Sequence, residues 1–421
     1  MAIHNRDGEV RAMVGGDDTK YAERPFNLAT QGQRQPGSSF KPFVLARALS
    51  DGISPSSLWE SKKKTYILKG GERFTVNNYN DAYAGVTTLA DATTFSDNSV
   101  FVQVGMRVKP ARVAKLARRM GIRTPVSHNF AIALGGLHQG VTPLDMAHAY
   151  ETFANRGRLV YGTLSPGQGH RIPVPGPVGI DAIEKTTSGK PVELPSGRKA
   201  VNRVRDRQVL RPGIADEVGA ILQTVVQKGS GTRAQIPGVV ISGKTGTTEN
   251  YGDAWFVGWT KEYTVAVWVG YPDRFKPMKT EFQGQPVAGG TFPAGIWKTF
   301  MESLLNIDPL PKSKDEAAAE SGTPTPTPGT AATATPVPTT AAGGGGTGGT
   351  GAGGAGTTGG GTGTGAGGDG TTGTGDGTTG TGGGAGTGTG GDGTTGTGGA
   401  GGTGAGGGAT GTGTTPPAGT G

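Results

Sequence analysis

The sequence predicts an α+β fold in which strands from both ends of the folded region form one antiparallel sheet. Apolar residues with helical spacing occupy the middle of this region. A short strand at Val10–Val14 follows an Asp7-Gly8 turn near the N-terminus, and three β-rich runs lie between residues 239 and 269. Helices in the middle with antiparallel strands at both ends are typical of an α+β domain whose sheet is completed by both termini.

The chain divides into a folded region and a tail of very different composition. It has 421 residues, of which 81 are Gly and none is Cys. From Ser321 onward it contains no Lys, no Arg and only three charged residues, all Asp, so this segment cannot bury enough apolar area to offset the entropy of ordering it. We therefore expect a folded domain at 1–310, a Pro/Thr-rich linker at 311–338 and a disordered Gly/Thr-rich tail at 339–421.

The net charge of the first 320 residues is +11, since they carry all 40 basic side chains and 29 of the 32 acidic ones. A charge of this size suits contact with an anionic membrane or wall polymer, and it is equally typical of a soluble protein with a basic surface. No Lys/Arg cluster indicates nucleic-acid binding. The absence of Cys excludes disulfides, thiolate catalysis and cysteine metal sites, and no metal or cofactor is expected.

The first residues carry no signal for membrane insertion. No apolar run reaches the roughly 20 residues that a helix needs to span a bilayer, and the N-terminus lacks the apolar core of a signal peptide. Residues 1–7 instead have the pattern of a strand that enters the Asp7-Gly8 turn. We expect a chain that begins inside a hairpin, as a truncated protein would, and that contains no membrane anchor.

Apolar spacing and capping signals predict helices at 38–49, 110–120, 143–156, 214–226 and 291–305. The first helix must begin close to Ser38, because Pro42 is tolerated only in a first helical turn. Thr142 is the expected cap of the third helix, and Gly157 lies just past its end.

Three β-rich runs, Val239–Ile241, Trp255–Thr260 and Thr264–Val269, predict a meander against which the 291–305 helix packs. The region Arg158–Leu210 is rich in Gly, Pro and charged residues. This composition predicts either a loop insertion or a small β excursion.

Three short motifs occur in one order along the chain: Ser38-Ser-Phe-Lys41, Ser96-Asp97-Asn98 and Lys244-Thr245-Gly246-Thr247. Each is weak alone, because a Ser-x-x-Lys match occurs by chance roughly once or twice in a chain of this length. A second match, Ser61 to Lys64, lies in a charged run, and we interpret it as solvated and without function. The three motifs together are a strong signal of one site.

Lys41 is the expected base for a nucleophilic Ser38. The two positions are three apart, so they share a face of a helix. A serine hydroxyl is a poor nucleophile until a neighbour takes its proton, and none of the five His residues has a sequence setting typical of a catalytic base. An ordinary Lys has a pKa of about 10.4. We expect burial and the nearby cation of Lys244 to lower the pKa of Lys41.

The second motif supplies polar groups to the same site. Ser96 can pass a proton to a leaving group, and Asn98 can orient Lys41 or accept a hydrogen bond from a substrate amide. The alternative interpretation is that Ser96-Asp97-Asn98 only caps a helix containing Val100–Val104.

The third motif follows an apolar strand in this prediction, and Gly246 leaves room for a peptide to lie against the strand edge. The Lys244 ammonium and the hydroxyls of Thr245 and Thr247 form a group of donors that suits a carboxylate. The Thr247 N–H can pair with that of Ser38 as an oxyanion hole. The alternative is a plain β-turn.

The segment Arg34–Phe43, which reads RQPGSSFKPF, resembles the nucleophile region of class A penicillin-binding proteins. The segments Lys244–Asn250 and Asp253–Trp259 resemble their third motif and the strand that follows it. The similarity runs from about residue 1 to residue 305 and includes Gly135-Gly136 and Val141–Ala147, which the chemistry of the residues alone does not explain. It implies a penicilloyl-serine-transferase (β-lactamase/transpeptidase-like) fold, with helices on both faces of an antiparallel sheet.

The resemblance also implies an activity. Ser38 would attack the D-Ala-D-Ala end of a peptidoglycan stem peptide, the acyl group would pass to the amine of a neighbouring stem, and β-lactams would acylate the same serine. The implied roles are base for Lys41, proton relay for Ser96, substrate orientation for Asn98, and substrate-carboxylate binding for Lys244, Thr245, Gly246 and Thr247. Such proteins act on the extracytoplasmic face of the bacterial cell envelope, and whether other cell-wall synthesis proteins bind this chain is left open.

Two features depart from related families. Class A proteins normally begin with a membrane helix and a glycosyltransferase domain, so we do not assign glycan polymerisation to this chain. β-Lactamases place Glu-x-x-Leu-Asn between the second and third motifs, whereas Glu302–Asn306 follows the third motif here, and we interpret it as a coincidence. A DD-carboxypeptidase, in which water replaces the acceptor amine, and a non-catalytic wall-binding module are the alternative functions.

Overall fold

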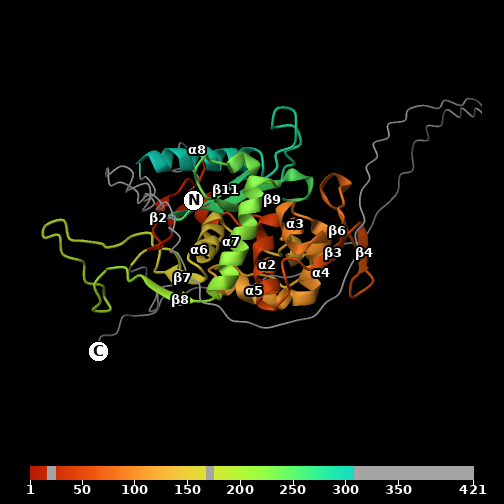
Figure 1. The fold of residues 1–421 in the computed structure, drawn as a ribbon. Helices are drawn as coiled ribbons and strands as arrows, with labels where there is room; N and C mark the ends of the chain where they lie inside the picture. Colours follow the sequence, from red (N-terminus) through yellow and green to blue (C-terminus); the bar gives the residue numbers. More distant parts are fainter. Residues whose placement is uncertain (17–24, 167–174, 308–421) are drawn as a thin grey trace, which may run out of the picture. The chain divides into compact units, whose positions relative to one another are not determined.

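The computed structural model describes residues 1–16, 25–166 and 175–307. The linker and tail expected at 311–338 and 339–421 lie outside these residues. The described part contains one five-stranded antiparallel sheet, three two-stranded sheets and helices on both faces of the large sheet (Figure 1). Within these ranges no helix is both long enough and apolar enough to cross a membrane.

The large sheet joins the two ends of the described chain. Its strands, in spatial order, are β2 (Val10–Ala12), β1 (Ala2–His4), β11 (Tyr263–Gly270), β10 (Asp253–Trp259) and β9 (Ser242–Thr247). All neighbouring strands are antiparallel. β1, the first strand along the chain, pairs with β11, the last, with Ile3 opposite Thr264. The prediction that both ends of the folded region complete one sheet is therefore confirmed.

Helices cover both faces of this sheet, as Figure 1 shows. Helix α8 (Phe292–Ile307) packs against β10 and β11 on one face, while α6 (Pro143–Ala154) and α7 (Pro212–Gln227) cover the other. Side chains of β10 alternate between the two layers: Phe256 meets Trp297 of α8 at a ring-centroid distance of 5.4 Å, and its neighbours pack on the opposite side. Because both layers exclude water, every residue of β10 is buried.

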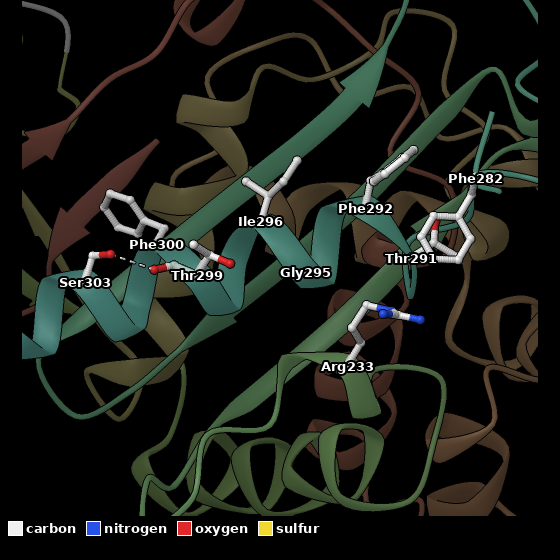
Figure 2. Close-up of a pocket in the computed structure, with 9 residues that line it drawn as sticks. All are labelled: Arg233, Phe282, Thr291, Phe292, Gly295, Ile296, Thr299, Phe300 and Ser303. Atoms are coloured by element: carbon white, nitrogen blue, oxygen red, sulfur yellow. Dashed lines mark hydrogen bonds between the residues drawn. The ribbon is translucent and has the colours of Figure 1, made fainter.

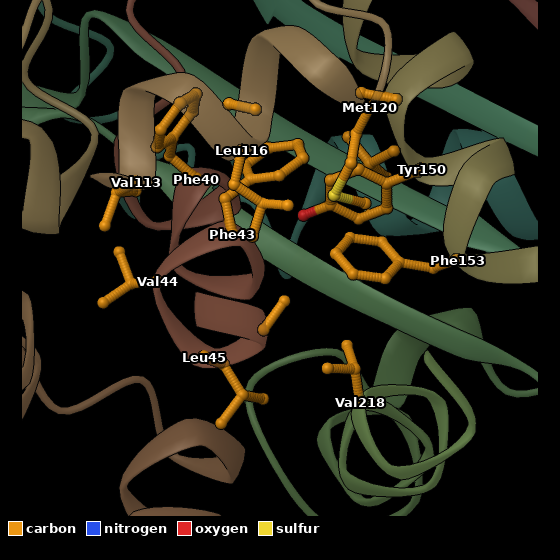
Figure 3. Packing of buried hydrophobic residues seen from close by; sticks show 14 of the residues in the cluster. Phe40, Phe43, Val44, Leu45, Val113, Leu116, Met120, Tyr150, Phe153 and Val218 are labelled. Atoms are coloured by element: carbon orange, nitrogen blue, oxygen red, sulfur yellow. The ribbon is translucent and has the colours of Figure 1, made fainter. Parts of the chain in front are cut away.

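The main hydrophobic core anchors the segment that follows Ser38. Phe40 and Phe43 lie 4.7 Å apart between ring centroids, and Phe43 contacts Tyr150 and Phe153 of α6 (Figure 3). These side chains are at most 3% exposed. Burial of each large apolar side chain stabilises the fold by about 1.5–3 kcal/mol, so this cluster holds helix α2 (Lys41–Ser50) firmly against α6.

The remaining elements surround this core. The other helices are α1 (Leu28–Gln31), α2 (Lys41–Ser50), α3 (Leu89–Thr94), α4 (Asn98–Val108) and α5 (Pro110–Arg119). The small sheets pair β3 (Leu58–Ser61) with β6 (Gly85–Thr88), β4 (Lys64–Ile67) with β5 (Arg73–Val76), and β7 (Arg158–Tyr161) with β8 (Arg205–Gln208). The last pair confirms the β-excursion interpretation of the 158–210 region.

One predicted strand is wrong. The run Val239–Ile241 is not a strand, and β9 begins only at Ser242. Gly238 turns the chain with a φ of +75°, and the side chain of Val240 is 69% exposed. Pairing with β10 runs instead from Ser242 to Thr247, so the third motif lies inside the strand and does not follow it.

Candidate active site

The three motifs lie on elements that meet at one end of the sheet. Ser38 is half-buried in a short 3-10 helix, η2 (Gly37–Phe40), which leads directly into α2 and so to Lys41 at its first position. Ser96 ends the turn between α3 and α4, and Lys244 lies on β9. Both lysines are 0% exposed, so two ionisable amines are enclosed within the protein at this point.

The Lys41 side chain contacts the second motif. Its Nζ donates to the Ser96 carbonyl at 2.7 Å, to Ser96 Oγ at 3.3 Å and to Asn98 Oδ1 at 2.7 Å. The backbone N–H of Lys41 donates to the Ser38 carbonyl, which keeps the two residues on consecutive turns. Among the described residues, no hydrogen bond joins Lys41 Nζ to Ser38 Oγ.

The Lys244 side chain reaches the same serine from the opposite side. Its Nζ donates to Ser96 Oγ at 2.8 Å and to the Thr245 carbonyl at 3.2 Å. The Ser96 hydroxyl therefore lies between Lys41 and Lys244 and bridges them. Ser96 itself has a φ of +62°, a left-handed conformation that is uncommon for Ser and that directs it into this position.

Burial lowers the pKa of both amines, and the charge of Lys244 also acts on Lys41. Burial lowers the pKa of Lys41 well below its ordinary value, the charge of Lys244 lowers it further, and Asp97 opposes these effects. Burial lowers the pKa of Lys244 from 10.5 to about 7. Both lysines therefore give up a proton far more readily than an exposed lysine does.

The second motif also caps a helix. Asp97 is the N-cap of α4, and its Oδ1 accepts a hydrogen bond from Val100 N at 2.8 Å. The capping interpretation of Ser96-Asp97-Asn98 is thus correct, and it accompanies the contacts of Ser96 and Asn98 with Lys41. The cap fixes the start of α4 and so the side chains beside the lysine.

The Thr hydroxyls of the third motif have defined partners. Thr245 Oγ1 lies 2.6 Å from Ser230 Oγ, and Thr247 Oγ1 accepts a hydrogen bond from Gly289 N at 3.0 Å. The second contact leaves the hydroxyl proton of Thr247 available to a ligand. Strand β9 is an edge strand of the described sheet, with only β10 beside it.

Glycines allow the nucleophile segment and the third motif to touch through their backbones. A Cβ on Gly246 would lie 2.4 Å from the Pro36 carbonyl oxygen, and one on Gly37 would lie 2.8 Å from that of Thr247. Gly135 has a φ of +77° and would place a Cβ 2.0 Å from the Gly37 carbonyl oxygen. This contact explains Gly135, whose role depends on a partner far away in the sequence, whereas a Cβ on Gly136 would meet Ala131.

The interpretation of the second Ser-x-x-Lys match as solvated is wrong. Ser61 is 1% exposed, and its hydroxyl donates to the Asp97 carboxylate. Lys64 Nζ pairs with Glu60 at 3.1 Å and donates to Gln103 Oε1 at 2.9 Å, neither of which belongs to a motif. The β3–β6 strand pair places Ser61 beside Asp97 at the start of α4, which the charged sequence around Ser61 does not indicate.

A separate pocket lies along α8, as Figure 2 shows. It has a volume of about 540 Å³, and its nine lining residues are Arg233, Phe282, Thr291, Phe292, Gly295, Ile296, Thr299, Phe300 and Ser303. None belongs to the three motifs, and only Arg233 is ionisable; its guanidinium lies 5.1 Å from the Phe282 ring centroid. The described residues contain no group of three or more His, Asp or Glu side chains that could hold a metal ion.

Known proteins share this arrangement of sequence and fold. The family model described as "Penicillin binding protein transpeptidase domain" matches residues 1–279. Penicillin-binding protein 1A of Neisseria lactamica is 33% identical over 318 residues, which cover 73% of this chain and 36% of that protein. The chain thus spans about a third of the length of this curated relative.

Solved structures agree with this similarity. The PonA1 protein of Mycobacterium tuberculosis in complex with penicillin V is 25% identical, with a TM-score of 0.59 that covers 74% of this chain and 78% of that one. Penicillin-binding protein 1A from Haemophilus influenzae is 24% identical, with a TM-score of 0.60 over 74% of this chain and 48% of that one.

Proposed function

The chain belongs to the penicillin-binding protein transpeptidase family, and from this premise we propose that it is a serine DD-transpeptidase that cross-links peptidoglycan stem peptides through an acyl-enzyme on Ser38. The observation that carries the proposal is the hydrogen-bonded link between the motifs. The Ser96 hydroxyl lies within hydrogen-bond distance of both Lys244 and Lys41, and Lys41 is one turn from Ser38. A base and a proton relay in such contact, beside a serine nucleophile, are what acyl transfer requires.

In the first half-reaction, Ser38 Oγ attacks the carbonyl carbon between the two terminal D-Ala residues. Lys41, as the free amine, takes the hydroxyl proton. The tetrahedral intermediate collapses when the C–N bond breaks, and Ser96 passes a proton from the lysine to the departing D-Ala amine. An ester between Ser38 and the stem peptide remains.

In the second half-reaction, the amine of a neighbouring stem attacks this ester. Lys41 accepts the proton of the amine through Ser96, the C–O bond to Ser38 breaks, and the serine recovers its proton. A new amide joins the two stems, and the enzyme returns to its starting state with atoms and protons balanced.

Electrostatics support Lys41 as the base. Its pKa is lowered by burial and by the charge of Lys244, and this shift favours the free amine that a base requires. Asn98 accepts a hydrogen bond from Lys41 Nζ and so keeps the amine beside Ser96. No dedicated base for water is assigned, so the acyl-enzyme persists until an acceptor amine arrives.

The third motif serves as the substrate cradle. Lys244 and the hydroxyls of Thr245 and Thr247 bind the terminal carboxylate, and Gly246 leaves the edge of β9 open for an extended peptide to pair with it. The backbone N–H groups of Ser38 and Thr247 form the oxyanion hole. Contact between Gly37 and the Thr247 backbone brings these two donors into one region.

Several wider assignments belong to the same proposal. Residues 1–310 form the transpeptidase domain, with 311–338 as a linker and 339–421 as a tail. The domain acts on the extracytoplasmic face of the bacterial cell envelope, on stem peptides ending in D-Ala-D-Ala, and β-lactams acylate it. PonA1, a relative of 25% identity, binds penicillin V.

A labelled penicillin tests the proposal. We expect the wild-type protein to form a covalent adduct that peptide mapping locates on Ser38, and Ser38→Ala to form none. Loss of the nucleophile lowers turnover in serine enzymes by about 10⁶-fold, so the contrast will be clear. Ser39→Ala is the matched control, because Ser39 is adjacent but its hydroxyl is held by the Pro36 carbonyl at 2.7 Å. An adduct that survives in Ser38→Ala contradicts the proposal.

Product analysis separates the transpeptidase from the alternatives. With a stem pentapeptide and an acceptor amine, we expect an amide-linked dimer and free D-Ala. Release of D-Ala without any dimer indicates a DD-carboxypeptidase. Failure to release D-Ala, together with failure to bind the labelled penicillin covalently, indicates a non-catalytic wall-binding module.

A further inference from the structure

We propose that Asn78 is a positioning residue for acyl transfer, whose carboxamide holds the Ser96-Asp97-Asn98 segment against Lys41. The inference rests on the proposed function, since it concerns the same site. Asn78 lies in the loop between β5 and β6, outside the three motifs.

The two ends of the Asn78 carboxamide bind different parts of the second motif. Its Oδ1 accepts from the backbone N–H groups of Asn98, at 2.8 Å, and Ser99, at 3.0 Å, which are the first of α4. Its Nδ2 donates to Asp97 Oδ2 at 2.7 Å. One side chain thus satisfies free donors of the helix start and a carboxylate acceptor at once.

The same loop sets the orientation of Asn98. The Asn98 Nδ2 donates to the Asn77 carbonyl at 2.8 Å. Because a carboxamide has its oxygen opposite its nitrogen, this bond turns Oδ1 toward Lys41 Nζ, 2.7 Å away. A shift of the 77–78 backbone would therefore rotate or withdraw the oxygen that holds the base.

The Asp97 carboxylate is the electrostatic part of this arrangement. It accepts hydrogen bonds from Asn78, Ser61 and Val100, so three donors fix its place. The charged groups that act on Lys41 are Lys244, from β9, which lowers its pKa, and Asp97, which raises it. Asn78 holds the Asp97 carboxylate at a fixed distance from the Lys41 amine. That distance sets how far Asp97 offsets the lowering of the Lys41 pKa by Lys244.

A matched pair of variants tests the inference. Asn78→Asp keeps the shape and the acceptor toward α4, but it replaces the Nδ2 donor with an oxygen that faces the Asp97 carboxylate. Asn80→Asp makes the same chemical change two residues along the loop, on an exposed side chain whose φ of +54° Asp tolerates. Rates of acylation by a labelled penicillin are measured across pH, with thermal unfolding of each variant alongside.

We expect Asn78→Asp to lower the second-order acylation rate constant at neutral pH by about tenfold or more, as a change of one pKa unit or a small displacement of the base does. The rising limb of the pH profile moves to higher pH, because added negative charge stabilises the ammonium form of Lys41. Asn80→Asp leaves both the rate and the profile at wild-type values.

A charge-swapped variant covers the case in which Asn78→Asp does not fold. In Asn78→Asp/Asp97→Asn the amide and the carboxylate exchange places, so the contact between them and the cap of α4 are both restored. We expect this variant to fold and to recover most of the acylation rate. A swap that is no better than Asn78→Asp overturns the inference.

The remaining outcomes separate this inference from the proposed function. Absence of an adduct on wild-type Ser38 overturns both. A wild-type adduct, with Asn78→Asp equal to Asn80→Asp in rate and profile, overturns the inference alone. A lower rate in Asn78→Asp with an unshifted profile and a matching loss of thermal stability also overturns it, since that result indicates a merely structural role.

Discussion

Two buried lysine amines, those of Lys41 and Lys244, form hydrogen bonds to one serine hydroxyl. Enclosing like charges away from water opposes folding, because each charged form loses its solvation and repels the other. Hydrogen bonds that the two amines donate to Ser96, Asn98 and the Thr245 carbonyl offset part of this cost. Burial therefore makes the two lysine amines more acidic and at the same time lowers the free energy of unfolding, a trade-off that is common at functional sites.

A prediction about stability follows for Lys244. Its pKa is about 7 in the folded state against 10.5 as the ordinary value. Because the folded pKa is depressed, the unfolded state binds more protons between these values, so wild-type stability rises with pH across this window. We expect Lys244→Met to raise the melting temperature at about pH 6 while abolishing acylation, and the gain to shrink by about pH 9.5.

Lys261→Met is the control for this experiment, because the Lys261 side chain is 73% exposed. It should leave the melting temperature unchanged at both pH values. A lower melting temperature for Lys244→Met at about pH 6, or the same change at about pH 6 and about pH 9.5, would contradict the prediction. Either result would mean that the buried Lys244 charge is not the main destabilising effect at this position.

At the scale of elements, the contact between η2 and β9 depends on a missing side chain. We predict that Gly246→Ala lowers the melting temperature by several degrees and slows acylation at least tenfold, because a Cβ would meet the Pro36 carbonyl oxygen at 2.4 Å. Overlap with rigid backbone must displace one of the two elements, at about 1–3 kcal/mol. Thermal unfolding and labelled-penicillin kinetics measure the two effects.

Gly213→Ala provides the comparison for that prediction. Gly213 lies in the first turn of α7, and nothing lies within 4 Å of the position that its Cβ would take. Alanine is favoured over glycine in helices by up to about 1 kcal/mol, so this variant should be as stable as the wild type or more so. Equal losses in both variants would show that the backbone contact at Gly246 is unimportant.

Local signals predicted elements well where the interactions are local. Thr142 was expected to cap a helix beginning at Pro143, and its hydroxyl accepts from Asp145 N at 3.0 Å. The strand expected at Val239–Ile241 is absent because pairing with β10, a tertiary contact, selects the residues after it. An apolar run alone does not reveal which of two adjacent segments finds a partner.

The same reasoning applies to the candidate site. The sequence predicted Ser38, Lys41, Ser96 and Lys244 as site residues because each lies in a recognisable motif. In the structure they lie on adjoining elements. Asn78 and Ser230 carry no such signal, and the motif match at Ser61 was misinterpreted, since the contacts of all three depend on neighbours distant in the sequence. Contacts of that kind become visible only in three dimensions.

At the scale of the whole molecule, the fold is that of the penicillin-binding protein transpeptidases, as the sequence resemblance implied. Its sheet includes the first residues of the described chain as an inner strand. Ile3 of β1 is 0% exposed and packs in the main core. The N-terminal strand is therefore integral to the sheet that carries Lys244.

We predict that Ile3→Ala lowers the free energy of unfolding by about 2–5 kcal/mol, the usual cost of truncating a buried isoleucine. Val14→Ala, in the same N-terminal segment but at a side chain that is 79% exposed, should change it by less than about 0.5 kcal/mol. Urea unfolding of both variants checks this expectation. Similar small changes in the two would mean that β1 contributes little to the core.

The position of β1 between β2 and β11 has a consequence for how the protein is made. Residues 2–4 leave the ribosome long before their partners at 263–265 exist, so the sheet cannot close on the nascent chain until synthesis is nearly past the described region. Contacts so distant in sequence form slowly. Lys244 lies on β9 of the same sheet, so it too reaches Ser96 and Lys41 only after most of the described region has been made. Under the function proposed above, a β-lactam adduct on Ser38 would therefore report how many newly made chains have completed the site.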